Sequence, residues 1–210
     1  MSSSDQNPAA TPASPSVSSQ VLDMGAQLVQ ALKPVKQMKQ HACSFALYSR
    51  DPGRQLEVHH FVSRLNQDVL QCGVYDSDKP SARLIGVEYI VSDAIFETLP
   101  PDEQRLWHSH AYEVKAGLWT DVGVPEALQR SEMAGLAKTP STRAARAPDL
   151  VARRDERFRV DSSAGGLMAA RVEMEEPEWI NPNADYWRVH GKGFAVDVVP
   201  AEMKRHAPFP

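Results

Sequence analysis

The residue types in this chain that could carry chemistry are mainly imidazoles and carboxylates. Imidazole nitrogens and carboxylate oxygens bind zinc or iron when several of them converge on one point. Six such side chains are our candidate ligand-binding residues: His59, His60, His108, His110, Glu113 and His190. Three of these are also the candidate metal ligands: His60, His110 and Glu113. A divalent transition metal is the cofactor that such a set would take.

The spacing of the histidines limits which of them can act together. On a helix, His108 and His110 would point about 200° apart, whereas on a strand they would project from the same side. The residues on both sides of this pair are helix formers and favour a helix. His59 and His60 are adjacent, so at most one of them looks inward from a strand. The alternative to a binding site is that these histidines lie at the core edge and hydrogen-bond to neighbouring groups.

Other groups that could support catalysis give weaker signals. No G-x-S-x-G motif occurs, and Ser109 lacks the strand-to-helix turn that exposes a hydrolase nucleophile. Cys43 and Cys72 lie among apolar neighbours, which is typical of structural thiols, and we expect both to be free. The pair Gly165-Gly166 is not followed by the Lys-Ser or Lys-Thr of a phosphate-binding loop. No catalytic residue is therefore identified, and a non-enzymatic role is favoured over an enzyme.

The elements that would position these residues predict an α+β fold with an antiparallel sheet in a single domain. Apolar residues alternate with polar ones in two runs between residues 55 and 75, a pattern that indicates strands. The segment from Arg83 to Val91 is apolar on both parities, and it predicts a central strand. We expect the sheet to span residues 55–91.

Helices are expected to pack on this sheet. Ser92 and Asp93 are typical N-cap residues for a short helix. The second helix is expected to begin at Pro101 and to run to about Lys115. A charged helix is predicted from Asp149 to Phe158. Residues 177–194 carry several aromatic side chains between polar residues, and we expect this segment to close one face of the domain.

The N-terminal part divides into a tail and a helix. Residues 1–20 contain almost no large apolar side chain, and their composition predicts a disordered tail. An amphipathic helical segment is expected over residues 21–40, with the helix itself from Val21 to Lys33 and a stop or kink at Pro34. This helix has two possible uses. Its apolar side packs on the core, or it inserts between lipids beside three nearby lysines: Lys33, Lys36 and Lys39.

Composition and charge exclude several classes of protein. The chain has 210 residues, 42% of them hydrophobic, which suits one soluble domain with tails. A net charge of -4 provides no positive field for nucleic acid, so we expect no nucleic-acid partner. No apolar run is long enough to span a bilayer, and no secretory signal pattern begins the chain. These features predict a cytoplasmic protein that meets lipid, if at all, at a surface.

Several stretches of the sequence resemble the oil-body-associated protein family, which is found in plants, fungi and bacteria. The stretches that carry the resemblance are residues 54–61 (RQLEVHHF), 66–72 (NQDVLQC), 75–80 (YDSDKP), 82–91 (ARLIGVEYIV), 106–114 (LWHSHAYEV), 176–182 (EPEWINP), 185–187 (DYW) and 190–194 (HGKGF). They occur in the family's order and define an expected domain over residues 41–196. Relatives carry a block rich in aromatic, Gly and Pro residues that this chain replaces by a short segment near residues 140–148.

The resemblance implies association with oil bodies and a role in their size and stability, but it implies no reaction. Our leading hypothesis is therefore a non-enzymatic protein that binds a lipid-droplet or membrane surface. The alternative is a protein that binds a metal or small ligand through the His/Glu residues, including an enzyme of an uncharacterised kind. A third hypothesis is a scaffold that binds other proteins through its aromatic C-terminal segment, although the sequence identifies no particular protein partner.

Overall fold

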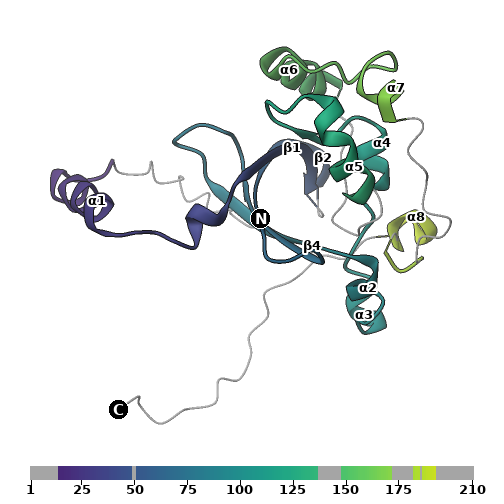
Figure 1. Ribbon diagram of the computed structural model, residues 1–210, viewed down its shortest axis with the longest axis horizontal. Helices are drawn as coiled ribbons and strands as arrows, with labels where there is room; N and C mark the ends of the chain where they lie inside the picture. Colours follow the sequence, from purple (N-terminus) through teal and green to yellow (C-terminus); the bar gives the residue numbers. More distant parts are fainter. Residues whose placement is uncertain (1–13, 49–50, 137–147, 172–181, 185, 193–210) are drawn as a thin grey trace, which may run out of the picture. The chain divides into compact units, whose positions relative to one another are not determined.

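A computed structural model of the chain describes residues 14–48, 51–136, 148–171, 182–184 and 186–192 (Figure 1). The chain divides into two units, residues 1–36 and residues 37–210, and each is described by itself. The helices and strands are, in chain order, α1 Val17–Val29, the 3-10 helix η1 Val35–Gln37, β1 Gln40–Tyr48, β2 Asp51–Arg64, β3 Val69–Tyr75, β4 Leu84–Val91, α2 Asp93–Phe96, α3 Pro101–Gln104, α4 Ala111–Lys115, β5 Thr120–Asp121, α5 Glu126–Leu136, α6 Pro148–Phe158, α7 Leu167–Arg171 and α8 Tyr186–His190.

The α-helix of the first unit, among its described residues, is α1. Ser16 caps its N-terminus, where the Ser16 side chain accepts a hydrogen bond from the backbone N–H of Ser19. The helix therefore begins within residues 17–20, which we expected to be disordered, while residues 1–13 of that tail lie outside the described residues. It ends at Val29 and not at Lys33, because a proline at position 34 clashes with the carbonyl of residue 30 in a helix. No helix among the described residues is long and apolar enough to cross a membrane.

The second unit is built on a five-stranded antiparallel sheet with the strand order β4-β3-β2-β1-β5. This arrangement, with several helices, confirms the predicted α+β fold. The sheet is larger than expected, because β2 begins at Asp51 and because β1 and β5 add strands outside residues 55–91. Residues 42–48 have apolar or small side chains on both parities, so no alternation marks β1 in the sequence.

The predicted central strand, β4, lies instead at the edge of the sheet. The apolar side chains of one parity, among them Val87 and Tyr89, are exposed, whereas Glu88 and Ile90 point into the protein. An apolar run on both parities is typical of a strand covered on both faces. Here one face of β4 remains open among the described residues, so the pattern led to the wrong position in the sheet.

The two faces of the sheet carry different cores. Face A is defined by Ala42, His60, Val62, Cys72 and Ile90, which lie on one side through the pairing of β1 to β4. The apolar side chains of face A pack against residues of α4, of α5 and of the loop between them: Val114, Trp119, Met133 and Leu136.

Face B carries the alternate residues of the same strands, including Cys43, Phe45, Glu57 and His59. Its core forms where Phe45 packs with Leu118, and partly buried residues of α6 pack against this cluster. Both faces are covered near the middle of β2. For this reason His59 and His60 are both buried, contrary to the expectation that at most one would look inward.

The helices between residues 93 and 117 differ from the prediction in one important respect. The expected helix from Pro101 to Lys115 is broken into α3 and α4, and residues 105–110 lie between them without helical structure. The hydroxyl of Ser109 accepts a hydrogen bond from the backbone N–H of Ala111, a local contact that competes with helix continuation. The break frees His108 and His110 from the 200° separation that a continuous helix would impose.

Two fully buried arginines hold the loop between α4 and β5 in place. Arg154 of α6 donates hydrogen bonds to the carbonyls of Gly117 and Leu118, each at 2.9 Å. Arg171 of α7 donates to the carbonyls of Val114 and Trp119 at 2.9 and 2.7 Å. These contacts fix the position of Trp119, whose ring forms one wall of the site described next.

Candidate functional site

A buried carboxylate joins two histidines on face A. Glu88 of β4 lies 2.8 Å from Nε2 of His60 through its Oε2 atom and 3.4 Å from Nε2 of His110 through its Oε1 atom. His60 comes from β2 and His110 from the N-cap of α4, so three separate elements supply the group. The Trp119 ring lies 4.7 Å from the His60 ring and 5.0 Å from the His110 ring, measured between centroids, and it shields both from solvent.

A second acid and base pair lies beside the first. Oε1 of Glu113 is 3.6 Å from Nε2 of His108, which is near but longer than a hydrogen bond. The hydroxyl of Ser44, from β1, donates to Oε2 of Glu113 at 3.0 Å. The rings of His108 and His110 meet edge to face with centroids 5.5 Å apart. The break between α3 and α4 thus brings together two histidines that the predicted helix would have separated.

The pKa values of the two glutamates are shifted in opposite directions, because their surroundings differ. Burial raises the pKa of Glu113 well above its usual range, and the charge of Glu88 raises it further. Burial also opposes ionisation of Glu88, but the imidazoles of His60 and His110 hold the pKa of that carboxyl well below its usual range. Two neighbouring carboxyl groups with pKa values pushed apart are one way in which a site provides both an acid and a base.

Burial lowers the pKa values of His108 and His110. For His108 the pKa falls well below its usual range because of burial and the nearby His110, and the charge of Glu88 only partly opposes this. The pKa of His110 is lowered by burial, against the opposing effect of Glu88. Both imidazoles are therefore neutral at pH 7, the form that binds metals.

Several polar atoms of this cluster have no hydrogen-bond partner among the described residues. His108 is 4% exposed, yet neither Nδ1 nor Nε2 of its ring makes a hydrogen bond, and Nε2 only lies 3.6 Å from Glu113. Nδ1 of His60 is in the same condition. An unsatisfied buried polar group costs about 1–3 kcal/mol, so the fold retains these groups at a cost to stability. Such a set fits a small polar ligand or an ion.

The cluster has a route to the surface. A pocket of about 220 Å³ is lined by His60 and Glu88 together with apolar side chains that include Leu56, Val58 and Val74. Apolar walls around a few convergent polar groups are typical of ligand sites.

The predicted site residues divide into three groups. Four of the six lie in the face A cluster: His60, His108, His110 and Glu113. The metal set of His60, His110 and Glu113 does not share one point as predicted, because the two histidines contact Glu88 whereas Glu113 contacts Ser44. The remaining two lie elsewhere. His59 is on face B, and His190 is exposed on α8 with its ring against Tyr186 at 4.1 Å.

Glu88 is the central residue that the sequence analysis missed. It is the one acidic residue in the apolar segment Leu84–Val91, which the sequence analysis assigned to a central strand without a partner for this carboxylate. The signal was available, since a carboxylate in a buried strand needs partners.

Comparison with known proteins gives a consistent result. The model of a family described as "Protein of unknown function (DUF1264)" matches residues 32–141. Oil body-associated protein 2B of Zea mays is 72% identical to this chain, and oil body-associated protein 2A of Zea mays is 50% identical, in both cases over the full length of both proteins. Oil body-associated protein 2C of Arabidopsis thaliana is 42% identical over 92% of this chain and 93% of its own length. No solved structure matches the chain.

The alignment also bears on the length of the chain. It extends over 250 positions with the first of these relatives, whereas this chain has 210 residues, so the relative has residues without a counterpart here. We expected the shortening near residues 140–148, and residues 140–147 lie outside the described residues, so its position stays a prediction.

Proposed function

This chain belongs to the oil-body-associated protein family, and on that premise we propose that it binds the surface of oil bodies through helix α1 and acts there without catalysing a reaction. The observation that carries the proposal is that α1 has an apolar side and no buried residue. A helix with this pattern normally covers the core of its own domain. When no core covers it, a lipid monolayer is a surface that its apolar side fits.

The apolar side of α1 is continuous along the helix. At 100° per residue, Val17, Val21, Met24 and Leu28 lie within about 60° of one another. They are highly exposed, Leu28 to 88% and Val21 to 64%. The opposite side contains mainly small and polar residues with a single charge, Asp23, but it also carries Leu22 and Val29. This division into two sides is what insertion into an interface requires.

The expected binding strength is modest. Full burial of one such side chain is worth about 1.5–3 kcal/mol, so half burial of these four gives about 3–6 kcal/mol. Lysines near anionic headgroups add about 1 kcal/mol each, and Lys33, Lys36 and Lys39 follow the helix directly. The total of about 6–9 kcal/mol corresponds to reversible binding with a Kd between the sub-micromolar range and roughly tens of micromolar. We expect a protein that exchanges between the droplet surface and solution.

Flotation with synthetic droplets tests the proposal. The droplets consist of triacylglycerol covered by phosphatidylcholine, a zwitterionic monolayer that neither attracts nor repels added charge. We compare the full chain with the double variant Val21→Glu/Leu28→Glu on the apolar side and with Gln20→Glu/Gln27→Glu on the polar flank beside it. Both variants add two negative charges to the same helix. Only the first should weaken binding, by about tenfold to hundredfold, because it removes two half-buried apolar side chains.

Two measurements make the comparison decisive. The urea midpoint of all three proteins should be the same, because none of the substituted side chains of α1 is buried. Equal flotation of the two variants, or a full chain that stays in the soluble fraction, would exclude α1 as the lipid-binding element.

A second candidate function is binding of a metal or small polar ligand at the face A cluster. The unpaired nitrogens of His108 favour it. The test is elemental analysis of purified protein in a Cys43→Ser background, comparing His108→Ala with His190→Ala, the exposed histidine outside the cluster. Metal content that falls with His108→Ala alone would support a site, whereas less than a tenth of an equivalent in every protein would exclude a metal.

A further inference from the structure

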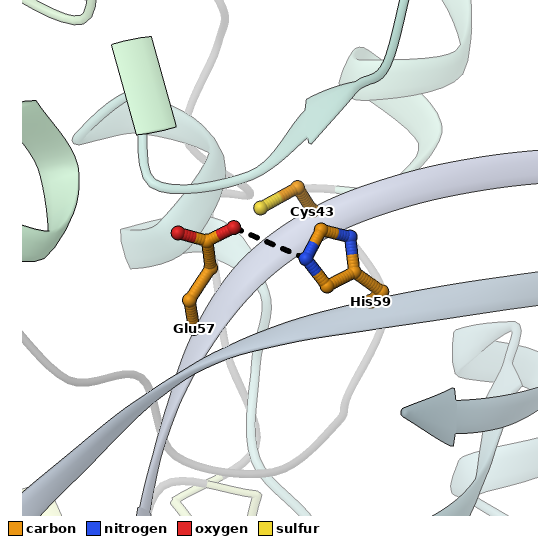
Figure 2. Close-up of side chains that lie close together, drawn as sticks. All are labelled: Cys43, Glu57 and His59. Carbon is orange, nitrogen blue, oxygen red and sulfur yellow. Dashed lines mark hydrogen bonds and ion pairs between the residues drawn. The ribbon is translucent and has the colours of Figure 1, made fainter. Parts of the chain in front are cut away.

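Three metal-binding side chains meet on face B, away from the cluster already described. Cys43 of β1 and His59 of β2 are direct cross-strand partners, and Glu57 lies two residues before His59 on the same side of β2. One donor atom of each lies within 4.8 Å of the other two. Figure 2 shows the thiol, the carboxylate and the imidazole pointing toward a common centre. Among the described residues, this is the one group of three or more His, Cys, Asp and Glu residues with such spacing.

The group is buried and its histidine is held by other side chains. Cys43 and His59 are 0 and 1% exposed, and the Glu57 side chain is 14% exposed. Nδ1 of His59 lies 2.9 Å from Nε2 of His41. The His41 ring stacks on Phe61, with centroids 4.7 Å apart and planes 8° apart. A histidine whose second nitrogen is held in this way keeps the ring orientation and tautomer that a metal needs.

A cation already contacts the acceptors of this group. Nη2 of Arg157, on α6, donates to Oε1 of Glu57 and lies 3.3 Å from Nε2 of His59. These are the two atoms to which a metal would bind. The Arg157 side chain is 42% exposed, so its guanidinium can leave for solvent without crossing the core.

We propose that Cys43, Glu57 and His59 form a binding site for a divalent transition metal of the zinc type, which displaces the guanidinium of Arg157. One sulfur, one nitrogen and one oxygen donor match the ligands of zinc and cobalt, whereas magnesium and calcium require oxygen ligands. Donors around one zinc ion lie about 3.3–3.8 Å apart. Nε2 of His59 and Oε1 of Glu57 are 3.0 Å apart, so closing the group around an ion needs only small side-chain movements.

Replacement of the Arg157 guanidinium by a metal ion balances in charge and in protons. Before binding, the Glu57 carboxylate is neutralised by Arg157, and Cys43 is a neutral thiol because burial raises its pKa. On binding, the S–H bond of Cys43 breaks, a sulfur–metal bond forms and the proton goes to solvent. One divalent ion then neutralises one thiolate and one carboxylate. His59 presents the lone pair of Nε2 and donates its Nδ1–H to His41. The fourth position of a tetrahedral ion remains for water or another ligand.

Titration of the full chain with cobalt(II) tests this assignment, because a thiolate bound to cobalt gives a charge-transfer absorption band. We expect the band with one equivalent of cobalt. It should disappear in Cys43→Ser and persist in Cys72→Ser, a matched control in which the other buried cysteine, on face A, is replaced. No band in the unaltered chain, or equal bands in the two variants, would overturn the proposal.

Two further variants examine the other ligands. Glu57→Gln should bind cobalt at least tenfold more weakly, and unchanged affinity would remove Glu57 from the site. Arg157→Gln should bind more tightly, because no guanidinium competes, and equal or weaker binding would overturn the exchange. If Cys43→Ser fails to fold, X-ray absorption of the zinc-loaded unaltered chain replaces it. One sulfur ligand at about 2.3 Å is expected, and a shell without sulfur would overturn the proposal.

Discussion

Replacing Arg171 by methionine is the perturbation whose consequence follows most directly from the structure. Arg171 is fully buried and makes four hydrogen bonds, two to the carbonyls of Val114 and Trp119 and two to the carboxylate oxygens of Glu126. Methionine has a similar length and no donor. The variant would therefore leave two buried carbonyls and one partly buried carboxylate without their partner.

The magnitude can be worked out from these contacts. A buried carbonyl that loses its donor costs about 1–3 kcal/mol. Removing one partner of a buried ion pair costs about 3–5 kcal/mol, a measured total that already includes groups left without a partner. We expect a loss of about 3–5 kcal/mol. With a urea dependence of about 2 kcal/mol per molar, the unfolding midpoint should fall by roughly 1.5–2.5 M. This is a large part of the roughly 5–15 kcal/mol that stabilises a typical domain.

Urea unfolding followed by tryptophan fluorescence measures the effect. Arg153→Met is the control, because Arg153 is an exposed arginine of α6, and its replacement should change stability by less than about 0.5 kcal/mol. In the Arg171→Met background, Glu126→Gln should restore part of the loss by removing the unpaired charge. A loss below about 1 kcal/mol for Arg171→Met would refute the view that this arginine holds the wall of the face A cluster.

Three further changes test the electrostatics and the backbone. Burial and Glu88 raise the folded-state pKa of Glu113, so this residue lowers stability once pH exceeds its unfolded-state pKa of about 4.3. In urea titrations Glu113→Gln should therefore become increasingly more stable than the unaltered chain between pH 4 and pH 8. A stability difference that stays constant with pH would contradict this. Glu88 has a folded-state pKa held low by His60 and His110 against the opposing effect of burial. Its contribution to stability is therefore present above about pH 4.3 and is lost as pH falls through the folded-state pKa. The destabilisation caused by Glu88→Gln should shrink in acid, and a destabilisation that grows in acid would contradict the assigned sign. Gly117 has a φ of +66°, and a Cβ there would lie 3.3 Å from a backbone oxygen, so Gly117→Ala should cost more than the roughly 1–2 kcal/mol of the left-handed conformation alone. Gly123→Ala, at φ +77° with open space around it, should cost only the conformational part, and an equal or larger loss there would exclude a steric contribution at position 117.

Local patterns were sufficient for the elements whose residues interact mainly with near neighbours. The amphipathic period before Pro34 predicted a helix, and the charged segment from Asp149 to Phe158 predicted α6, which begins one residue earlier at Pro148. Alternation in Val69–Tyr75 predicted β3. In each case the signal is the spacing of side chains along one element, which the sequence contains directly.

The positions of these elements relative to one another depended on contacts that no local pattern contains. β4 has the composition of a central strand but lies at the edge, because which strand pairs with which is decided by the whole sheet. Local propensity favoured a continuous helix through His108 and His110, and contacts of His110 with Glu88 and Trp119 accompany its interruption. The fold class could therefore be predicted from the sequence, whereas the position of each element within the fold could not.

The sequence by itself determined that this is an α+β chain with an amphipathic N-terminal helix and a set of histidines and glutamates of metal-binding type. Only the tertiary structure decided how those side chains group. It joined His60 and His110 through Glu88, and it placed His59 with Cys43 and Glu57 on the other face of the same strand. The physical reason is that adjacent residues of a strand point to opposite faces, so the partners of each are chosen by the neighbouring strands and helices that cover that face.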